Sequence, residues 1–274
     1  MKFTPGPFMR FLARRVDPGS PTGIYLSVGL GCAIVTLLGF LSIAEDVMES
    51  ATFAIDRWVW AWSVAVRTPV LTRVFWVATL AGDTRVMFVS TTLAALALIA
   101  WRRWRGALVV VLLVVVGSRL DGVLKGLFER PRPPAHLALI AQPASASFPS
   151  GHALSSLMLF GTLALLLLLS ARARPLPVAG ALACVLAFLT IATSRVYLGV
   201  HYTSDVIASW LLGAALMAPA VAALLAWERF RPPQGAPQPA GLWLRIGRGA
   251  LVVIAPFALV AALVMEAGAN PLLH

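Results

Sequence analysis

Long stretches without a charged side chain alternate along this chain with short segments that are rich in Arg, Lys and Pro. A helix that rises about 1.5 Å per residue needs roughly 20 apolar residues to cross the hydrocarbon core of a bilayer. Charge-free stretches close to that length run over residues 24–43, 86–101, 153–171, 175–194, 206–227 and 249–265. A shorter one, 106–118, becomes long enough if the helix continues to about Leu124. The pattern predicts seven membrane-spanning helices.

The predicted helices fall into a group of six and a separate seventh. Residues 228–248 include "RPPQGAPQPAG", a Pro- and Gly-rich stretch typical of a linker. The apolar run that follows Arg15 is longer than the apolar part of a secretory signal, so we expect a retained span. We therefore expect an all-α, polytopic membrane helical bundle. It would comprise an N-terminal segment (1–23), a six-span core (24–227), the linker, and an additional span with its tail (249–274).

Composition agrees with a membrane protein. Of the 274 residues, 59% are hydrophobic and 12% are charged, whereas about 25% are charged in an average soluble domain. A net charge of +11 would also suit nucleic-acid binding, but the basic residues do not form one patch. Segments 1–23, 102–105, 172–174 and 228–248 hold 13 of the 22 Lys and Arg residues and only two acidic residues. The positive-inside rule makes these segments, and the N-terminus, cytoplasmic.

Three polar segments stand on the opposite, outer side of the predicted membrane. They are "KGLFERPRPP" from Lys125, "PSGH" from Pro149, and "SRVYLGVHYTSD" from Ser194. Each has a plain structural interpretation when taken alone: cations at span ends extend to the interface, and a serine before a helix caps it. Together on one side, they favour a functional site.

The third segment contains a pair suited to nucleophilic catalysis. His201 and Asp205 are four residues apart where a span begins, so a helix places them on one face. Asp205 can accept the proton of one ring nitrogen and leave the other nitrogen free as a nucleophile. His152, on the same side, is the candidate general acid that protonates the departing oxygen.

The other polar residues suit phosphate. Phosphoryl transfer spreads negative charge over three oxygens, so fixed donors and cations stabilise it. Lys125, Arg132 and Arg195 supply cations. Ser150 and Gly151 lie where a helix begins, and the free N–H groups of a helix N-terminus bind phosphate. We find neither an HExxH motif nor a DxD cluster and expect no metal or other cofactor.

These three segments resemble the signature of the type 2 phosphatidic acid phosphatase family, whose soluble relatives include vanadium haloperoxidases. Lys125 is followed after six residues by Arg-Pro, then comes PSGH, then Ser-Arg, five residues, His, three residues and Asp. The resemblance extends over roughly residues 53–227, including "FAIDRWVWAWSVAVRTP" and "LAGD".

The resemblance implies a six-helix core and a phosphohistidine intermediate on His201. It also implies that His152 is the acid, that Asp205 orients the nucleophile and that no metal takes part. The phosphate would be held by Lys125, Arg132, Ser150, Gly151 and Arg195. The seventh span departs from the six-span plan of the family.

From these observations we expect an integral membrane lipid phosphatase. It would remove a terminal phosphate from a lipid phosphate or pyrophosphate at the outer face of the cytoplasmic membrane. Undecaprenyl pyrophosphate is the favoured substrate, because the predicted orientation faces the side where that lipid is released. Phosphatidylglycerophosphate, phosphatidic acid and lipid A 1-phosphate are alternatives, as is phosphotransfer to a second lipid. An anionic-lipid transporter is the alternative of another class. The expected partners are the lipid phosphate and the bilayer, and no nucleic acid.

Overall fold

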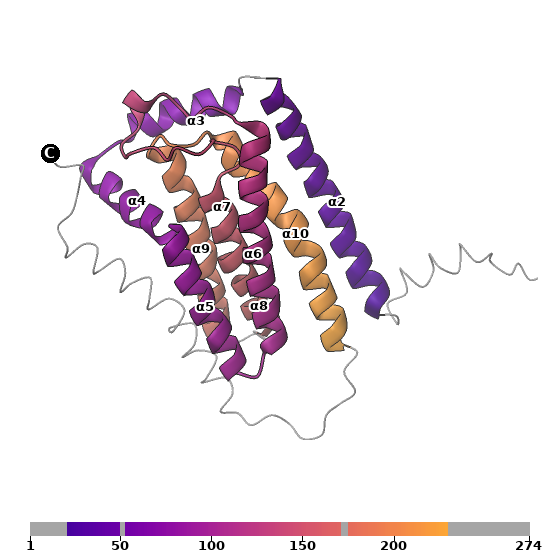
Figure 1. Cartoon of the computed structure of the whole chain (residues 1–274). Coiled ribbons are helices and arrows are strands. Elements are labelled where there is room, and N and C mark those ends of the chain that lie inside the picture. Colours follow the sequence, from indigo (N-terminus) through magenta and orange to yellow (C-terminus); the bar gives the residue numbers. More distant parts are fainter. Residues whose placement is uncertain (1–20, 50–52, 171–174, 230–274) are drawn as a thin grey trace, which may run out of the picture.

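Helices make up every regular element in the described part of the chain, residues 21–49, 53–170 and 175–229 of the computed structural model (Figure 1). In chain order they are α2 (Pro21–Met48), α3 (Ala54–Ala65), α4 (Pro69–Ala81), α5 (Thr84–Ala100), α6 (Trp104–Phe128), η1 (Ala135–Leu137), α7 (Gly151–Ser156), η2 (Leu157–Gly161), α8 (Thr162–Ser170), α9 (Pro175–Tyr197) and α10 (Thr203–Arg229). The predicted all-α bundle is confirmed. Residues 1–20 and 230–248 and the predicted seventh span, 249–265, lie outside the described residues, so the proposed division of the chain stays a prediction.

Among residues 21–49, 53–170 and 175–229, five stretches of helix are long and apolar enough to cross a membrane, and a bent pair of helices makes a sixth when counted as one span. The five are α2, α6, α9, α10 and the continuous run from α7 to α8. The bent pair is α4 and α5, whose axes meet at 61°. Asp83 begins α5 by accepting a hydrogen bond from the backbone N–H of Arg85 at 2.9 Å. The second span therefore begins before residue 86, where the charge-free window had placed its start.

Helix α3 lies across one end of the bundle (Figure 1). Its tryptophans recur at every second position, a spacing that would also suit a strand. In the helix Trp58 and Trp62 are exposed, while Asp56 and Ser63 are buried. An amphipathic helix of this kind suits the membrane interface, where tryptophan side chains concentrate.

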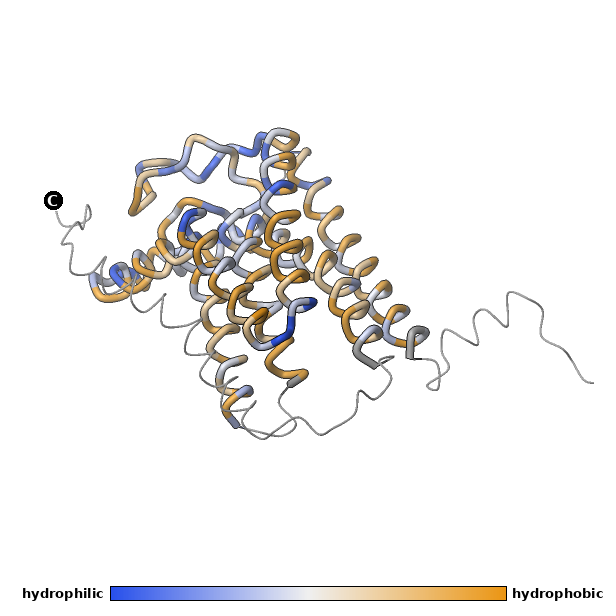
Figure 2. Tube along the Cα trace, turned by 60° about the horizontal axis from the view of Figure 1, so that its bottom comes forward, coloured by the Kyte–Doolittle hydropathy of each residue, from blue (hydrophilic) through white to orange (hydrophobic). Residues whose placement is uncertain are grey.

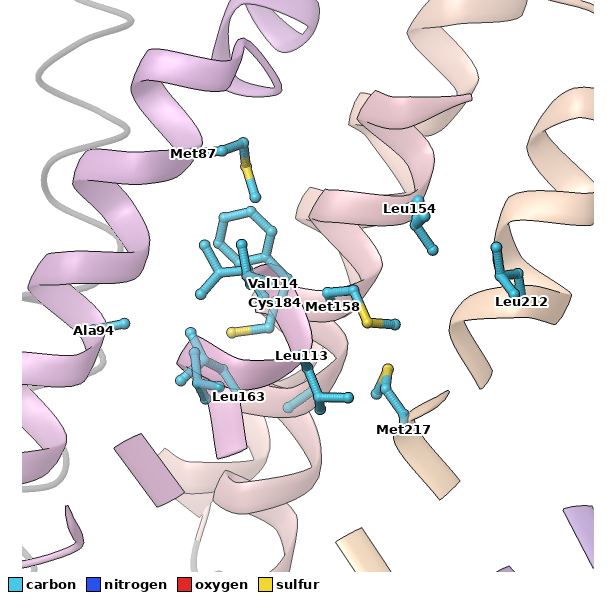
Figure 3. Close-up of a cluster of buried hydrophobic side chains, with 14 of the residues drawn as sticks. Met87, Ala94, Leu113, Val114, Leu154, Met158, Leu163, Cys184, Leu212 and Met217 are labelled. Carbon is cyan, nitrogen blue, oxygen red and sulfur yellow. The ribbon is translucent and has the colours of Figure 1, made fainter. Parts of the chain in front are cut away.

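The run from α7 through η2 to α8 is the central helix of the bundle. Its Leu154, Met158 and Leu163 side chains are almost fully buried among those of α5, α6, α9 and α10 (Figure 3). The middle of this helix, η2, is a π-helical segment. Figure 2 shows hydrophobic positions along the lengths of the helices and hydrophilic positions mainly at their ends. The interior is therefore mainly apolar, and the charged side chains of the described spans gather toward the helix ends.

Helix α2 packs mainly against α10, beside which it runs for most of its length (Figure 1). The two backbones come close at Gly29, where a Cβ atom would lie 2.5 Å from Ala222 Cβ and 2.9 Å from the Ala218 carbonyl oxygen. Small residues at such contacts let membrane helices approach closely, because side-chain packing drives their association.

We expect Gly29→Leu to destabilise the protein by on the order of 1–3 kcal/mol, because the added side chain must push α2 away from α10. Thermal unfolding in detergent would measure this. Gly31→Leu is the matched control, since a Cβ at Gly31 has no neighbouring atom within 4 Å. Equal unfolding temperatures for the two variants would contradict the close packing of α2 on α10.

Candidate active site

The three polar motifs meet at one end of the bundle, which we call the site end. The first lies where α6 ends, the second where α7 begins, and the third between α9 and α10. Residues 129–150 form a loop over this end and are held to the neighbouring turn, where the Leu139 N–H donates to the Leu198 carbonyl at 2.9 Å. The Ser150 N–H donates to Ser209 Oγ at 2.8 Å, which joins the start of α7 to α10.

His201 lies in the turn between α9 and α10. Gly199 makes this turn with a φ of 75°, and a Cβ there would lie 2.9 Å from the Leu137 carbonyl oxygen. The turn allows the backbone N–H of His201 to donate to the Arg195 carbonyl at 3.2 Å. The histidine is thereby fixed in place by its backbone and is only 4% exposed.

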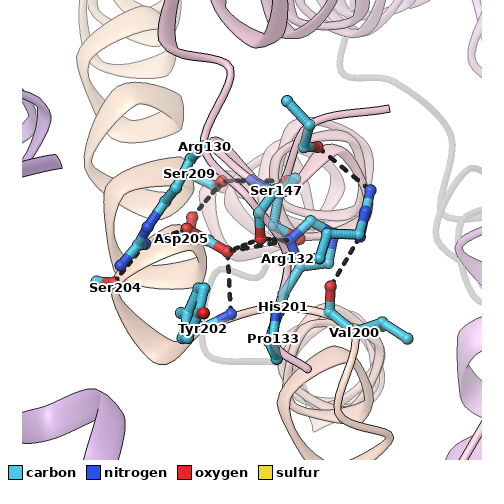
Figure 4. A network of polar contacts seen from close by, with 12 residues as sticks. Arg130, Arg132, Pro133, Ser147, Val200, His201, Tyr202, Ser204, Asp205 and Ser209 are labelled. Carbon is cyan, nitrogen blue, oxygen red and sulfur yellow. Dashed lines mark hydrogen bonds and ion pairs between the residues drawn. The ribbon is translucent and has the colours of Figure 1, made fainter. Parts of the chain in front are cut away.

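The contacts of the His201 ring define its tautomer. Nδ1 lies 3.2 Å from Asp205 Oδ2, and Nε2 lies 3.1 Å from Arg132 Nη1 (Figure 4). A guanidinium can only donate, so Nε2 accepts and the ring proton lies on Nδ1, facing the carboxylate. The predicted His201–Asp205 pair is therefore within hydrogen-bond distance, and the Nε2 lone pair points toward a cation.

The His201 ring is neutral at neutral pH. Burial lowers the pKa of His201 to about 4, against the opposing effect of the Asp205 carboxylate, which raises it. A neutral imidazole keeps the lone pair that a nucleophile needs.

Asp205 is fully buried, and protein donors satisfy both of its oxygens. Besides His201, Oδ2 accepts hydrogen bonds from Ser147 Oγ at 2.5 Å and from the Tyr202 N–H at 2.9 Å. Oδ1 accepts a hydrogen bond from Arg130. Sequence reasoning found Asp205 but missed Ser147 and Arg130 as its partners. Arg130 stands two residues before Arg132 in "RPRP", and nothing in that spacing shows which arginine faces the carboxylate.

Two of the predicted phosphate-binding residues present buried polar atoms without a hydrogen-bond partner among the described residues. These atoms are Ser150 Oγ and Arg195 Nε, in side chains that are fully buried and 3% exposed, respectively. Arg195 also donates through Nη1 to Thr79 Oγ1. A buried polar group without a partner costs about 1–3 kcal/mol. Both atoms carry hydrogens that could be donated to phosphate oxygens.

Lys125 and Gly151 lie close to each other at the mouth of the site. Lys125 Nζ forms an ion pair with Asp121 Oδ2 at 2.6 Å. A Cβ at Gly151 would lie 2.8 Å from that same oxygen and 3.1 Å from Nζ. Lys125 and Arg132 also line an open cavity of about 630 Å³. The absence of a side chain at Gly151 therefore keeps space beside the Lys125 ammonium.

His152 reaches the site from the first turn of α7. It forms a hydrogen bond with the Thr79 backbone, and the Arg195 guanidinium is close enough to interact with it electrostatically. A Cβ at Gly82 would lie 2.6 Å from His152 Cδ2, so the glycine of "LAGD" leaves room for this imidazole. All eight residues that the sequence singled out thus lie at the site end. Within the described residues, no group of three or more His, Cys, Asp or Glu could hold a metal ion.

Comparison with known proteins agrees with this arrangement. Residues 106–231 match the family model of the PAP2 superfamily. Phosphatidylglycerophosphatase B of Bacillus subtilis (strain 168) is 29% identical over 181 residues, which cover 65% of this chain and 88% of that protein. The undecaprenyl-diphosphatase of Sulfolobus acidocaldarius is 36% identical over 132 residues, which cover 46% of this chain and 59% of that protein.

The fold is also similar to a solved structure. The crystal structure of a transmembrane PAP2 type phosphatidylglycerolphosphate phosphatase from Bacillus subtilis superimposes with a TM-score of 0.60 at 25% identity. The match covers 73% of this chain and 98% of that chain. Relatives named as phosphatases and diphosphatases support a phosphoric ester hydrolase, so the transporter interpretation is set aside.

We expect Gly151→Ala to lower the release of phosphate from a lipid phosphate on the order of tenfold or more. Its methyl group would occupy the space beside Lys125 and Asp121, and each tenfold loss of rate corresponds to about 1.4 kcal/mol. Gly31→Ala on α2 is the matched control, because a Cβ there has no neighbour within 4 Å and Gly31 does not line the cavity beside Lys125. Equal phosphate release by the two variants would show that Gly151 does not border the site.

Asp205→Asn should lower kcat on the order of 10³-fold or more, by analogy with the same change in a catalytic triad. An amide cannot accept hydrogen bonds at both ends, so either Arg130 or the donors to Oδ2 would lose their acceptor. Initial rates of phosphate release would measure the loss, with the exposed Glu49→Gln as control. A wild-type kcat in folded Asp205→Asn protein would remove Asp205 from the reaction.

Proposed function

Because this chain belongs to the PAP2 superfamily and is a membrane lipid phosphatase, we propose that it removes the terminal phosphate of a polyprenyl pyrophosphate such as undecaprenyl pyrophosphate. The reaction would use a phosphohistidine intermediate on His201. The observation that carries the proposal is the His201 Nε2 lone pair, which points toward Arg132 while Ser150 Oγ and Arg195 Nε stay buried and unpaired among the described residues. A nucleophile among fixed cations and donors suits attack on phosphorus.

The proposed reaction proceeds in two displacements. His201 Nε2 attacks phosphorus, the bond from phosphorus to the bridging oxygen breaks, and His152 protonates the departing lipid oxygen. His152 then takes a proton from water, whose oxygen attacks phosphorus and breaks the P–N bond. Inorganic phosphate leaves, and the His201 ring becomes neutral again. Arg132 and Arg195 stabilise the charge that builds on the phosphoryl oxygens in both steps.

The proposed orientation puts the site end on the outer face of the cytoplasmic membrane. At the opposite end, the short turn between α5 and α6 carries Arg102 and Arg103, and Arg105 lies in the first turn of α6. The Arg105 guanidinium lies 4.9 Å from the ring centroids of both Trp104 and Trp227. A basic turn flanked by interfacial tryptophans supports a cytoplasmic location under the positive-inside rule.

Phosphatidylglycerophosphate is the second candidate substrate. The similarity to phosphatidylglycerophosphatase B covers most of that relative, whereas the similarity to the undecaprenyl-diphosphatase covers a smaller share of its length. The residues proposed to hold phosphate do not distinguish these lipids, because every candidate presents the same terminal phosphoryl group. The discrimination must come from whatever binds the rest of the lipid.

Phosphate release by the purified full-length chain in detergent, with EDTA present, tests the proposal. The panel would contain undecaprenyl pyrophosphate, phosphatidylglycerophosphate, phosphatidic acid and lipid A, with His201→Ala as the control. We expect EDTA-resistant release that is fastest from undecaprenyl pyrophosphate and absent in the variant, because the nucleophile and the cations are all side chains.

Other results would replace parts of the proposal. Faster release from phosphatidylglycerophosphate would select the second candidate. Loss of activity in EDTA would contradict the side-chain mechanism. Phosphorylated acceptor lipid in place of free phosphate would indicate phosphotransfer, and release by folded His201→Ala would remove His201 as the nucleophile.

A further inference from the structure

A buried carboxylate on α3 lies next to the proposed catalytic pair, although it is nearly 150 residues away in sequence. Asp56 is 6% exposed. Its Oδ2 accepts a hydrogen bond from Arg130 Nη2 at 3.2 Å and one from Ser204 Oγ at 2.6 Å. Its Oδ1 accepts from the Ser204 backbone N–H at 2.7 Å, in the first turn of α10. Asp56 thus joins α3, the loop of residues 129–150 and the turn that bears Asp205.

Arg130 bridges two carboxylates. Nη2 contacts Asp56. Nη1 donates to Asp205 Oδ1 and to Ser204 Oγ, the latter at 2.8 Å (Figure 4). The guanidinium also lies 4.3 Å from the ring centroid of Tyr202 and 5.5 Å from that of Phe53. Two acids and two aromatic rings hold the Arg130 side chain, which is only 11% exposed. Such a fork fixes both the position and the orientation of the group it binds.

The two arginines of "RPRP" therefore have different surroundings. Arg130 makes its described hydrogen bonds to Asp56, Ser204 and Asp205, so its charge is balanced by two carboxylates. Arg132 instead bonds to backbone carbonyls, to Ser145 Oγ and to the neutral His201 ring, and it has no carboxylate within ion-pair distance among the described residues. The positive charge of Arg132 stays available to an anionic substrate, whereas that of Arg130 does not.

From this division we infer that Asp56 and Arg130 form a positioning pair, which holds the Asp205 carboxylate so that Oδ2 faces His201 Nδ1 and sets how strongly Asp205 acts on the ring. The inference rests on the proposed role of His201 as nucleophile. In this arrangement the hydrogen bonds of the pair go to Ser204, to Asp205 and to each other, and not to phosphate. Both act through Asp205.

The pair affects the reaction through geometry and through charge. Arg130 fixes Oδ1, which leaves Oδ2 as the oxygen that faces His201. A misplacement of about 1 Å in a reacting group can cost on the order of 10²-fold in rate. The guanidinium also weakens the field of the Asp205 carboxylate at the ring, and Asp56 in turn weakens the field of the guanidinium. Changes at Asp56 and Arg130 should therefore move the titration of His201 in opposite directions.

Other charged groups also face His201, and they stay constant in the test. The ring is approached by Asp205 from α10, by Arg132 from the loop of residues 129–150, and by Arg195 from α9. His152, which also interacts with the His201 ring, approaches from α7. None of these four residues is changed in the Arg130 and Asp56 variants below, so a shift in the acid limb of their kcat/KM pH profiles reports on the pair.

The experiment measures kcat, KM and the acid limb of kcat/KM for Arg130→Met, Arg130→Lys and Asp56→Asn, using one substrate and the full-length protein. We expect Arg130→Met to lower kcat on the order of 10²-fold, with KM within about twofold of wild type, because substrate contacts are intact. Without the guanidinium Asp205 acts unopposed, so the His201 pKa rises and the acid limb moves to higher pH. Asp56→Asn should move it to lower pH.

Arg130→Lys separates charge from geometry. A lysine keeps the positive charge but lacks the fork that bonds both carboxylates. Its acid limb should stay near that of wild type while kcat is reduced. This variant also keeps the inference testable if Arg130→Met does not fold, as judged by thermal unfolding. Arg132→Met is the contrasting change, for which we expect a raised KM, because Arg132 faces the substrate side of the ring.

The outcomes separate the inference from the proposed function. A wild-type kcat and an unmoved acid limb in Arg130→Met, with His201→Ala inactive, would overturn the positioning pair and leave the nucleophile intact. A raised KM with unchanged kcat would make Arg130 a substrate-binding residue and would also overturn it. A third outcome is a lowered kcat in both Arg130→Met and Asp56→Asn with acid limbs of kcat/KM that move in the same direction. That result would reduce the pair to a purely structural role. No phosphate release by the wild-type chain would instead refute the proposed function.

Discussion

The site end is organised around one carboxylate that has no contact with solvent. Burying the charge of Asp205 is costly unless donors surround it, and removal of one partner of a buried ion pair typically costs about 3–5 kcal/mol. Its donors come from the loop of residues 129–150 and from the turn that begins α10. Satisfying this charge brings both segments close together, and α3 joins them because Asp56 forms an ion pair with Arg130. His201, the proposed nucleophile, is placed as a result.

The membrane-spanning helices could be predicted from the sequence because their requirements are local. A charge-free stretch of about 20 residues can satisfy all of its backbone hydrogen bonds only as a helix in a bilayer. The window over 206–227 matches α10, and the windows on either side of residue 172 match the central helix and α9. The grouping of the three motifs at one end followed from counting spans. The eight candidate site residues could be named because each stands in a motif with fixed internal spacing.

The rest of the site could not be predicted because it depends on contacts between distant segments. Asp56 precedes the first motif by about 70 residues, and no spacing rule connects it to Arg130 or Ser204. Ser147 lies in a loop with no periodic pattern. The α4–α5 bend was missed because charges at Asp83 and Arg85 divide one apolar window, although Asp83 is there to cap α5. The role of Gly82 was not predictable either, since it leaves room for the His152 imidazole on another helix.

The residues around His201 and Asp205 come from segments that are far apart in the chain, and this has a consequence for biosynthesis. Along the described chain Asp56 in α3 is translated first, the Arg130 loop follows, and Asp205 belongs to α10, the last described helix. A nascent chain that has inserted α2 to α9 holds the proposed cations and His152 but lacks both His201 and Asp205. Under the proposed mechanism, catalytic competence arises only when α10 inserts beside α2, and a truncated translation product that stops before α10 would be inert toward the lipids around it.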